Sequence, residues 1–355
     1  MATTTNNAVV YMGERNIQIQ DRPMPKCDID QVLVKVICTG ICGSDVHNYC
    51  DPKTHPGLIL GHESAGEIIE VGANVKGRHV GQRVAIEPAF VCRRCEFCCK
   101  GLQNVCAAMK YGGMDKTDGT LSQYFACEPE MAVPFPDHLP WEEAGCIQPM
   151  AIAVQLARQA NLRPHQTVAV FGCGPLGLMI MALAKAYGAS KIVAFDIEES
   201  RVDFAKTYAA DVGIVSPMNT SGKEPLGFAK EFINPLLSEY DLGYGVDLAI
   251  DASGAESCMQ MAVIITKPYG TYIQAGLGKQ LCSVPMWLIT AKGLTVKGTV
   301  RYSQGCFADA IDLLARKKVD IAPLISSKYP LTKAAEALEA QRAKEGIKIV
   351  IMNQE

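Results

Sequence analysis

The chain has 355 residues, of which 48% are hydrophobic and 20% are charged, and its formal net charge is −3. This composition is typical of a folded globular protein with length for about two domains. Acidic and basic residues are interleaved along the chain, which argues against a basic nucleic-acid-binding surface or a membrane-binding patch. We therefore expect a small-molecule partner, with no nucleic acid and no membrane.

The N-terminal stretch MATTTNNAVV lacks the basic, apolar and small-residue pattern of a signal peptide, and no apolar run is long enough to span a bilayer. We expect a cytoplasmic protein on this basis. In a reducing compartment its 15 cysteines would remain mostly thiols. Closely spaced cysteines then favour metal binding or catalysis over disulfides.

Before about residue 155, short alternating segments separated by Gly and Pro predict a β-rich lobe; these are 32–40, 65–72 and 81–88. The same region contains 40-GICGSDVH-47 and 61-GHESAGEIIEVGANV-75, in which Cys42, His62 and Glu63 offer a thiolate, an imidazole and a carboxylate. Three protein ligands leave one position for water or substrate, as in catalytic zinc sites. From these residues alone, ordinary packing roles for Cys42 and His62 remain an alternative.

The segment 91-VCRRCEFCCKGLQNVC-106 has four cysteines, Cys92, Cys95, Cys98 and Cys106, with the spacing C-x2-C-x2-C-x7-C. Short thiolate spacings let one tight loop surround a small tetrahedral ion, and four sulfurs leave no open position. The pattern predicts a structural zinc site, with an accidental cluster of buried thiols as the alternative. Cys99 is interpreted as a bystander.

From Val168 onward, buried-strand runs alternate with helical stretches, which predicts a doubly wound parallel sheet. The runs are 168–171, 192–195, 246–250, 270–275 and 294–298. The tail, from 311 to 352, is predicted as helix, loop, helix and a final strand, too short to be an independent domain.

The first of these strands is followed by 172-GCGPLG-177, a G-x-G-x-x-G motif that opens an apolar helix. The glycines allow a tight turn and close approach of the backbone to a pyrophosphate at the helix N-terminus. Asp196 ends the next strand, where a carboxylate would bind a ribose 2′-hydroxyl and repel a 2′-phosphate. We expect NAD(H) rather than NADP(H), although Arg201 counts against this preference. The alternative interpretation of these residues is a Gly-rich turn and a surface Asp with no coenzyme site. The predicted coenzyme contacts are Gly172, Gly174, Pro175, Leu176, Gly177, Asp196 and Arg201.

GHE, followed by Gly66, Gly72 and Val75, resembles the signature of the zinc-containing medium-chain dehydrogenases. CGSDVH, the four-cysteine loop and GxGxxG all occur in the order found in that family. The resemblance covers essentially the whole chain. It is greatest to the polyol branch, the sorbitol, xylitol and L-arabitol dehydrogenases, through 61-GHESAG-66, 251-DASGAE-256 and 299-TVRYSQG-305.

The resemblance implies an α/β protein with a GroES-like, β-rich catalytic domain, residues 1–155 completed by 299–355, and a Rossmann NAD-binding domain, residues 156–298. It implies one catalytic zinc at Cys42, His62 and Glu63, one structural zinc at the four cysteines, and NAD(H). In relatives a hydroxyl and a histidine at the positions of Ser44 and His47 carry the proton outward, and an Arg-Tyr pair at Arg301 and Tyr302 contacts polyol hydroxyls. The residues alone leave three alternatives open: Ser44 is a turn residue, His47 is a surface histidine, and 301–302 is an ordinary strand-end pair.

Two departures from the polyol pattern concern the substrate site. The segment 145-GCIQPMA-151 has Gln148 where these enzymes usually carry glutamate, and an amide can hydrogen-bond but cannot carry charge or act as a base. The segment between His47 and Gly61 is shorter than its usual counterpart and is expected to border the substrate entrance.

We expect a zinc-dependent oxidoreductase that transfers hydride between a secondary alcohol of a polyol and NAD, giving a ketose. Zinc would polarise the substrate hydroxyl and lower its pKa. The alternatives are the same chemistry on a specialised-metabolite alcohol, ketone or activated alkene, and a non-catalytic nucleotide-binding relative. The apolar segment 281–298, which includes Trp287, is where relatives pair, so a homodimer or homotetramer is expected by analogy, although a buried strand would have the same composition.

Overall fold

The computed structural model describes residues 5–220 and 222–355. The chain divides into two compact units, one formed by Met1–Ala151 with Tyr302–Glu355 and the other by Ile152–Arg301. The boundaries expected from the sequence, 155/156 and 298/299, lie a few residues from these limits. Among the described residues, no helix combines the length and apolar character needed to cross a membrane.

The main sheet of the first unit joins strands from both ends of the chain. Its order is β16-β17-β3-β4-β5-β9, and β8 also pairs with β3. The last strand is antiparallel to β3, so the C-terminal segment completes the sheet that the N-terminal half begins. Its strands are β3 (Val32–Gly40), β4 (Glu63–Val71), β5 (Arg83–Ile86), β8 (Tyr124–Cys127), β9 (Ala132–Pro134), β16 (Ile325–Pro330) and β17 (Lys348–Met352).

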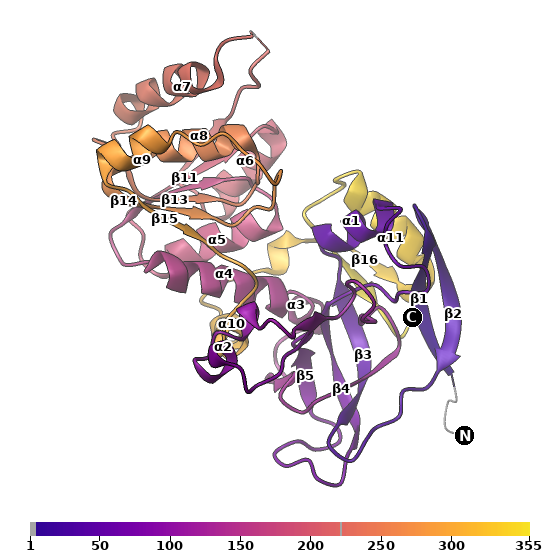
Figure 1. Ribbon diagram of the computed structural model, residues 1–355. Helices are drawn as coiled ribbons and strands as arrows, with labels where there is room; N and C mark the ends of the chain where they lie inside the picture. Colours follow the sequence, from indigo (N-terminus) through magenta and orange to yellow (C-terminus); the bar gives the residue numbers. More distant parts are fainter. Residues whose placement is uncertain (1–4, 221) are drawn as a thin grey trace. The chain divides into compact units, whose positions relative to one another are not determined.

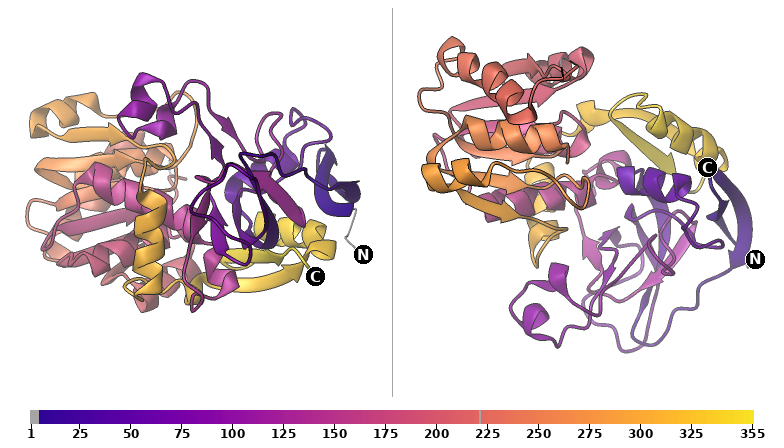
Figure 2. Two further views of the ribbon diagram at one scale, coloured as in Figure 1. Left: turned by 90° about the horizontal axis from the view of Figure 1, so that it is seen from below. Right: turned by 45° about the horizontal axis from the view of Figure 1, so that its top comes forward.

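An antiparallel hairpin, β1 (Thr5–Gly13) and β2 (Asn16–Pro23), lies outside this sheet. Buried residues of β1 share one hydrophobic core with α1 (Gly43–Cys50), α11 (Ala334–Arg342) and β17. Figure 2 shows the yellow C-terminal segment beside the indigo N-terminal strands in both views. A second core fills the other end of the main sheet, around Val34, Ile68 and Val84.

Short elements complete the first unit. They are β6 (Ala89–Phe90), α2 (Glu96–Cys99), η1 (Gln103–Val105), β7 (Lys110–Tyr111), α3 (Trp141–Ala144), α10 (Cys306–Ala315), η2 (Ala322–Leu324) and η3 (Leu331–Lys333). Helix α4 (Ile147–Ala160) contains the division between the two units.

The second unit is a parallel sheet with strand order β12-β11-β10-β13-β14-β15, the order of a doubly wound dinucleotide-binding fold. Central strands such as β10 are buried along both faces, which explains their uninterrupted apolar sequence. The strands are β10 (Thr167–Phe171), β11 (Lys191–Asp196), β12 (Val212–Val215), β13 (Val246–Asp251), β14 (Thr266–Gln274) and β15 (Thr295–Gly298).

Helices cover both faces of this sheet, with α4 and α5 on one and α8 and α9 on the other (Figure 1). The core of the unit combines buried residues of the strands with those of α7 and α8, including Phe171, Ile233 and Met261. The helices are α5 (Pro175–Ala186), α6 (Glu199–Tyr208), α7 (Pro225–Glu239), α8 (Glu256–Ile265) and α9 (Met286–Lys292). The expected α/β fold, with a β-rich lobe and a doubly wound parallel sheet, is confirmed.

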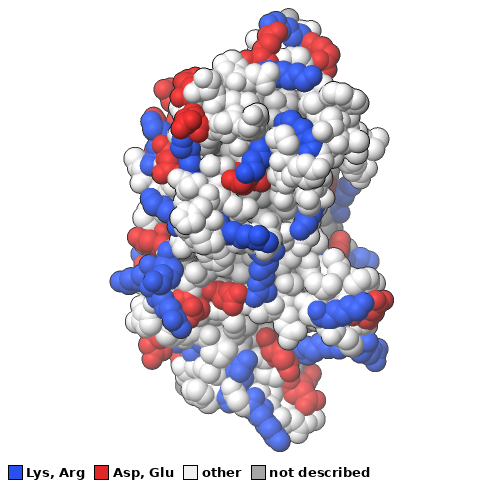
Figure 3. All heavy atoms as spheres, turned by 90° about the vertical axis from the view of Figure 1, so that its left-hand side faces the viewer, with Lys and Arg blue, Asp and Glu red and all other residues white. Residues whose placement is uncertain are grey.

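The charged side chains show no segregation by sign on the face drawn in Figure 3, where Lys and Arg alternate with Asp and Glu. This agrees with the small net charge of −3. A face of this kind produces no extended single-sign field that would attract a polyelectrolyte.

Candidate active site

Cys42, His62 and Glu63 converge in the first unit because β3 and β4 are paired. Gly40, at the end of β3, pairs with Glu63 at the start of β4, and Cys42 is the N-cap of α1 directly after β3. One ligand atom from each side chain lies within 4.8 Å of those from the other two. His62 and Glu63 are buried, so the cluster is shielded by the protein.

A thiolate, an imidazole and a carboxylate that converge in a buried site fit a borderline-soft divalent cation such as Zn²⁺. Three protein donors leave one tetrahedral position for an exogenous oxygen. The donor set therefore suits a catalytic rather than a closed structural metal centre.

Asp45 is a residue of this site that the sequence analysis did not identify. It is fully buried, and its Oδ1 lies 3.3 Å from Nδ1 of His62, a contact that is an ion pair when the imidazole is protonated. Its carboxylate also accepts hydrogen bonds from the backbone amides of Cys42, at 2.9 Å, and Gly61, at 3.0 Å. Burial by itself would raise the pKa of Asp45, but His62 and the two amides outweigh burial and hold that pKa below its usual value.

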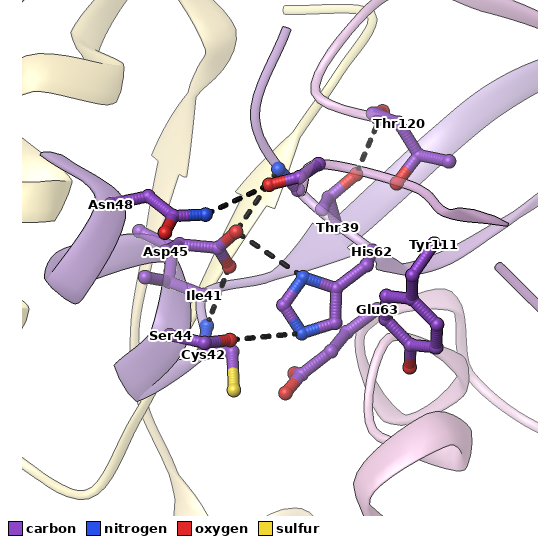
Figure 4. Close-up of polar contacts among 12 residues, drawn as sticks. Thr39, Ile41, Cys42, Ser44, Asp45, Asn48, His62, Glu63, Tyr111 and Thr120 are labelled. Carbon is purple, nitrogen blue, oxygen red and sulfur yellow. Dashed lines mark hydrogen bonds and ion pairs between the residues drawn. The ribbon is translucent and has the colours of Figure 1, made fainter. Parts of the chain in front are cut away.

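The contact with Asp45 leaves Nε2 of His62 facing Cys42 and Glu63 (Figure 4). A carboxylate behind a ligating histidine fixes the ring and its tautomer, which is the usual second layer of a metal site. Asp45 is the N3 residue of α1, whose N-cap is the candidate ligand Cys42. An acidic residue at N3 often caps the first backbone amide of a helix, so this spacing was a sequence signal for Asp45.

Lys348 is a second residue that sequence reasoning missed. This fully buried side chain forms an ion pair with Glu63 and donates a hydrogen bond of 2.8 Å to the carbonyl of Ile41. Burial would lower the pKa of Lys348, but Glu63 outweighs this effect and raises it, so the lysine is charged. The available signal was a single lysine in the apolar run 347-IKIVIM-352.

Ser44 and His47 lie one turn apart on α1. Oγ of Ser44 is 3.4 Å from Nε2 of His62, so this hydroxyl lies at the cluster. The side chain of His47 is 75% exposed, and its Nε2 is 3.8 Å from Oδ2 of Asp51. Of the pair implied by resemblance, Ser44 therefore faces the candidate metal ligands and His47 faces solvent.

Gln148 and Tyr302 meet in a buried hydrogen-bonded group with Tyr111, which the sequence analysis did not single out. Nε2 of Gln148 donates to the Tyr111 hydroxyl at 2.8 Å, and the hydroxyls of Tyr111 and Tyr302 are 3.2 Å apart. The Tyr111 ring contacts the His62 ring edge to face, with 5.7 Å between centroids. Arg301 ends the second unit with a left-handed backbone (φ 49°), so the predicted Arg-Tyr pair is divided between the two units.

The four predicted cysteines of the second cluster also converge. Sγ of Cys92 is 3.6 Å from Sγ of Cys106 and 4.0 Å from Sγ of Cys98, and one sulfur from each of the four lies within 4.8 Å of the others. Backbone amides, including that of Cys95, hydrogen-bond to Cys92 and lower the pKa of its thiol. Four sulfurs in this arrangement suit a closed tetrathiolate zinc site, and Cys99 is exposed beside it.

In the second unit, the glycine motif joins β10 to α5. Gly172 has φ 102°, and a Cβ on Gly177 would lie 1.9 Å from the Gly172 carbonyl oxygen, so both positions require glycine. Gly174 is the N-cap of α5, with Pro175 and Leu176 in its first turn.

Oδ2 of Asp196 accepts a hydrogen bond of 2.6 Å from the backbone amide of Cys173, which holds the carboxylate beside this turn. Arg201 is half-buried on α6.

Comparison with known proteins identifies relatives along the whole chain. The model of an alcohol dehydrogenase GroES-like domain matches residues 28–137, and that of a zinc-binding dehydrogenase matches residues 175–316. A probable D-xylulose reductase A of Aspergillus clavatus is 38% identical, covering 98% of this chain and 97% of that protein.

Solved structures show the same similarity. A structure described as a short chain alcohol dehydrogenase from Escherichia coli CFT073 in complex with NADH has a TM-score of 0.89 and 26% identity, covering 99% of this chain and all of the other (100%). L-idonate 5-dehydrogenase from Escherichia coli K-12 has a TM-score of 0.87 and 26% identity, covering 98% of each chain.

Proposed function

Because the chain belongs to the zinc-binding alcohol dehydrogenase family, we propose that it is a zinc- and NAD(H)-dependent polyol dehydrogenase. It interconverts a secondary alcohol of a polyol and the corresponding ketose. The observation that carries this proposal is the convergence of the half-buried Cys42 with the buried His62 and Glu63 in one site. Similarity to a probable D-xylulose reductase makes xylitol and D-xylulose the first pair to test.

The metal would be held by Cys42, His62 and Glu63. A bound Zn²⁺ would supply Lewis acidity, which lowers the pKa of a coordinated alcohol and so eases its deprotonation near neutral pH. The chain's own contribution is to orient the ligands: Asp45 holds the His62 ring, and Lys348 holds the Glu63 carboxylate. Both supporting groups are buried, so the ligand geometry is set before substrate arrives.

Ser44 and His47 would carry the proton outward. The Ser44 hydroxyl lies 3.4 Å from Nε2 of His62, beside the residues that would hold the metal, so it could pass a proton from the substrate hydroxyl. His47 lies one turn along α1, and its side chain is exposed to solvent, with which it could exchange a proton. Arg301 and Tyr302 are proposed to contact the remaining substrate hydroxyls.

The second unit would bind the coenzyme. Gly172, Gly174, Pro175, Leu176 and Gly177 provide a turn with close backbone access at a helix N-terminus, which suits a pyrophosphate. Asp196 would accept hydrogen bonds from the adenosine ribose and repel a 2′-phosphate, so NAD(H) is preferred over NADP(H) despite Arg201. Bound nicotinamide would accept or return the hydride.

The assembly and location are proposed by analogy. The segment 281–298 exposes Leu281 (89%), Met286 (63%) and Trp287 (75%) near the edge strand β15. Contiguous apolar exposure beside a sheet edge suits pairing with a second copy, so we propose a homodimer or homotetramer. We propose that the enzyme acts in the cytoplasm.

Gln148 supports one alternative, in which the same hydride chemistry acts on a specialised-metabolite alcohol, ketone or activated alkene. Gln148 is uncharged where the polyol enzymes usually carry glutamate, so the substrate side of the site has one negative charge less. A non-catalytic nucleotide-binding relative is less consistent with two intact candidate metal clusters.

A substrate panel separates these functions. NADH formation would be followed with xylitol, sorbitol, L-arabitol, galactitol and 2-butanol, each with NAD and with NADP, using protein of measured zinc content. Polyol oxidation with NAD in preference to NADP is the expected result. Zinc and NADH binding without turnover of any polyol would favour the alternative substrates.

A further inference from the structure

Asp251, the last residue of β13, is a fully buried carboxylate to which the proposed mechanism gives no role. Its Oδ1 accepts hydrogen bonds from the backbone amides of Ser253 and Gly254, at 2.7 and 3.1 Å, and from the Ser253 hydroxyl at 2.6 Å. Its Oδ2 accepts one from Nε2 of Gln274 at 2.9 Å. In the described part of the chain these partners are all uncharged, so no ion pair offsets the carboxylate.

The charge of Asp251 is the feature that needs a reason. A buried charge without a counter-ion is costly, and an uncharged side-chain oxygen could also accept hydrogen bonds from the loop. The charge acts on the interior around it: burial, and after burial the charge of Asp251, raise the pKa of the buried Tyr272 hydroxyl. An uncompensated negative charge therefore lies at the carboxyl end of the central strands.

The order of the sheet places Asp251 under one half of a bound dinucleotide. Strands β11 and β12 lie on one side of β10, and β13 and β14 lie on the other. A dinucleotide spans this change of direction, with its pyrophosphate at the glycine turn after β10. Because Asp196 ends β11, the adenosine half would lie over β11 and the nicotinamide half over β13 and β14.

Direct contacts join the loop after Asp251 to the glycine turn. The backbone amide of Ala252 donates to the carbonyl of Phe171 at 2.8 Å. A Cβ on Gly172 would lie 3.3 Å from the backbone nitrogen of Ser253. All of these residues belong to the second unit, so the carboxylate lies beside the predicted coenzyme turn within one compact body.

The two redox forms of the coenzyme differ in charge at the nicotinamide end, since the oxidised ring is positive and the reduced ring is neutral. A fixed negative charge in a poorly polarisable interior attracts the oxidised ring and has little effect on the reduced one. We infer that the buried charge of Asp251 makes the second unit bind NAD more tightly, relative to NADH, than a neutral residue would.

This inference rests on the proposed function and adds to it a determinant of the preferred redox state of the coenzyme. During oxidation of an alcohol, NADH is a product that competes with NAD for the same site. A charge that favours the oxidised form therefore weakens product inhibition. Asp251 would act on the nicotinamide ring through its field, without carrying a proton or contacting the substrate.

The test measures the Kd values of NAD, NADH and ADP-ribose for zinc-loaded wild type and Asp251→Asn. NADH binding is followed by its fluorescence, and the other two ligands by displacement of NADH. ADP-ribose lacks the nicotinamide ring and reports changes common to the whole coenzyme. In D251N we expect the Kd of NAD, divided by that of ADP-ribose, to rise about 10-fold. The same quotient for NADH should change by less than about twofold.

Three further variants separate charge from structure. Asp251→Glu retains the charge and should keep the quotient of the NAD and NADH constants within about twofold of wild type. Gln274→Lys places an ammonium beside the carboxylate and should shift that quotient in the same direction as D251N. Asp247→Asn, the matched control, removes a carboxylate that pairs with Lys267 at the other end of β13 and should leave the quotient unchanged.

Equal losses of NAD and NADH affinity in D251N would show that Asp251 only supports its loop, and would overturn the inference. A shift of the quotient in D247N or D251E as large as that in D251N would do the same. If D251N does not fold, the comparison of Q274K with wild type decides the question. Wild type that binds NAD but oxidises no polyol would contradict the proposed substrate, while the quotient still decides the role of Asp251.

Discussion

Two buried contacts, each with an acidic or basic side chain, support two of the three candidate metal ligands. Asp45 contacts His62, and Lys348 contacts Glu63. All four residues are at most 3% exposed, so solvent compensates little of the charge on these side chains. The candidate metal site therefore depends on Asp45 and Lys348, which lie outside the group of three ligands.

Asp45→Asn is predicted to weaken zinc binding without unfolding the protein. The amide removes the charge that holds Nδ1 of His62, and loss of such a supporting group typically costs about 10- to 100-fold in metal affinity. Zinc affinity would be measured by competition with a chromophoric chelator. Asp312→Asn, at a surface pair with Arg316, is the control. Equal affinity in D45N and wild type would show that Asp45 does not support the ligand.

Lys348→Met is predicted to destabilise the metal-free protein more than the zinc-loaded protein. Breaking a buried pair leaves an uncompensated carboxylate at a cost of about 3–5 kcal/mol, and a cation at Glu63 would offset part of this. Calorimetric melting with and without zinc measures both values. Lys328→Met removes a surface pair with Glu142 and should cost at most about 1 kcal/mol. Identical losses in the two metal states would contradict this role.

At the level of elements, the central strands and the glycine turn could be predicted from the sequence, but several outer strands could not. The strand run 168–171 is uninterrupted and apolar because β10 is buried on both faces. Strand β2 has only exposed and half-buried residues, β12 is four residues long, and polar residues interrupt β16, so these strands had no comparable signal. Their formation depends on neighbours supplied by distant parts of the chain.

The four-cysteine segment allows a prediction with an adjacent control. Cys98→Ser removes one sulfur of the cluster, whereas Cys99→Ser alters the exposed neighbour. We expect zinc content to fall from two ions per chain to one in C98S and to stay at two in C99S, because the described part of the chain offers two ligand groups. Limited proteolysis should cleave residues 91–106 faster only in C98S. Loss of zinc from both variants would contradict the assignment of Cys99 as a bystander.

At the scale of the whole molecule, the site combines residues that lie far apart in the chain. Lys348 follows its partner Glu63 by 285 positions, and Tyr302 follows Tyr111 by 191. Motif spacing identified Cys42, His62 and Glu63, since they are close in sequence. It could not reveal Lys348 or Tyr111, because these contacts arise only when the C-terminal segment completes the first unit.

The central claim is that this chain oxidises a polyol by zinc- and NAD-dependent hydride transfer. Its most direct test is the initial rate of NADH formation from xylitol, measured in native, zinc-depleted and zinc-restored protein, with chromatographic identification of the product. The account predicts D-xylulose formation that is lost on zinc removal and recovered on its return. Fully zinc-loaded protein that binds NAD but forms no ketose, or turnover that persists without zinc, would contradict it.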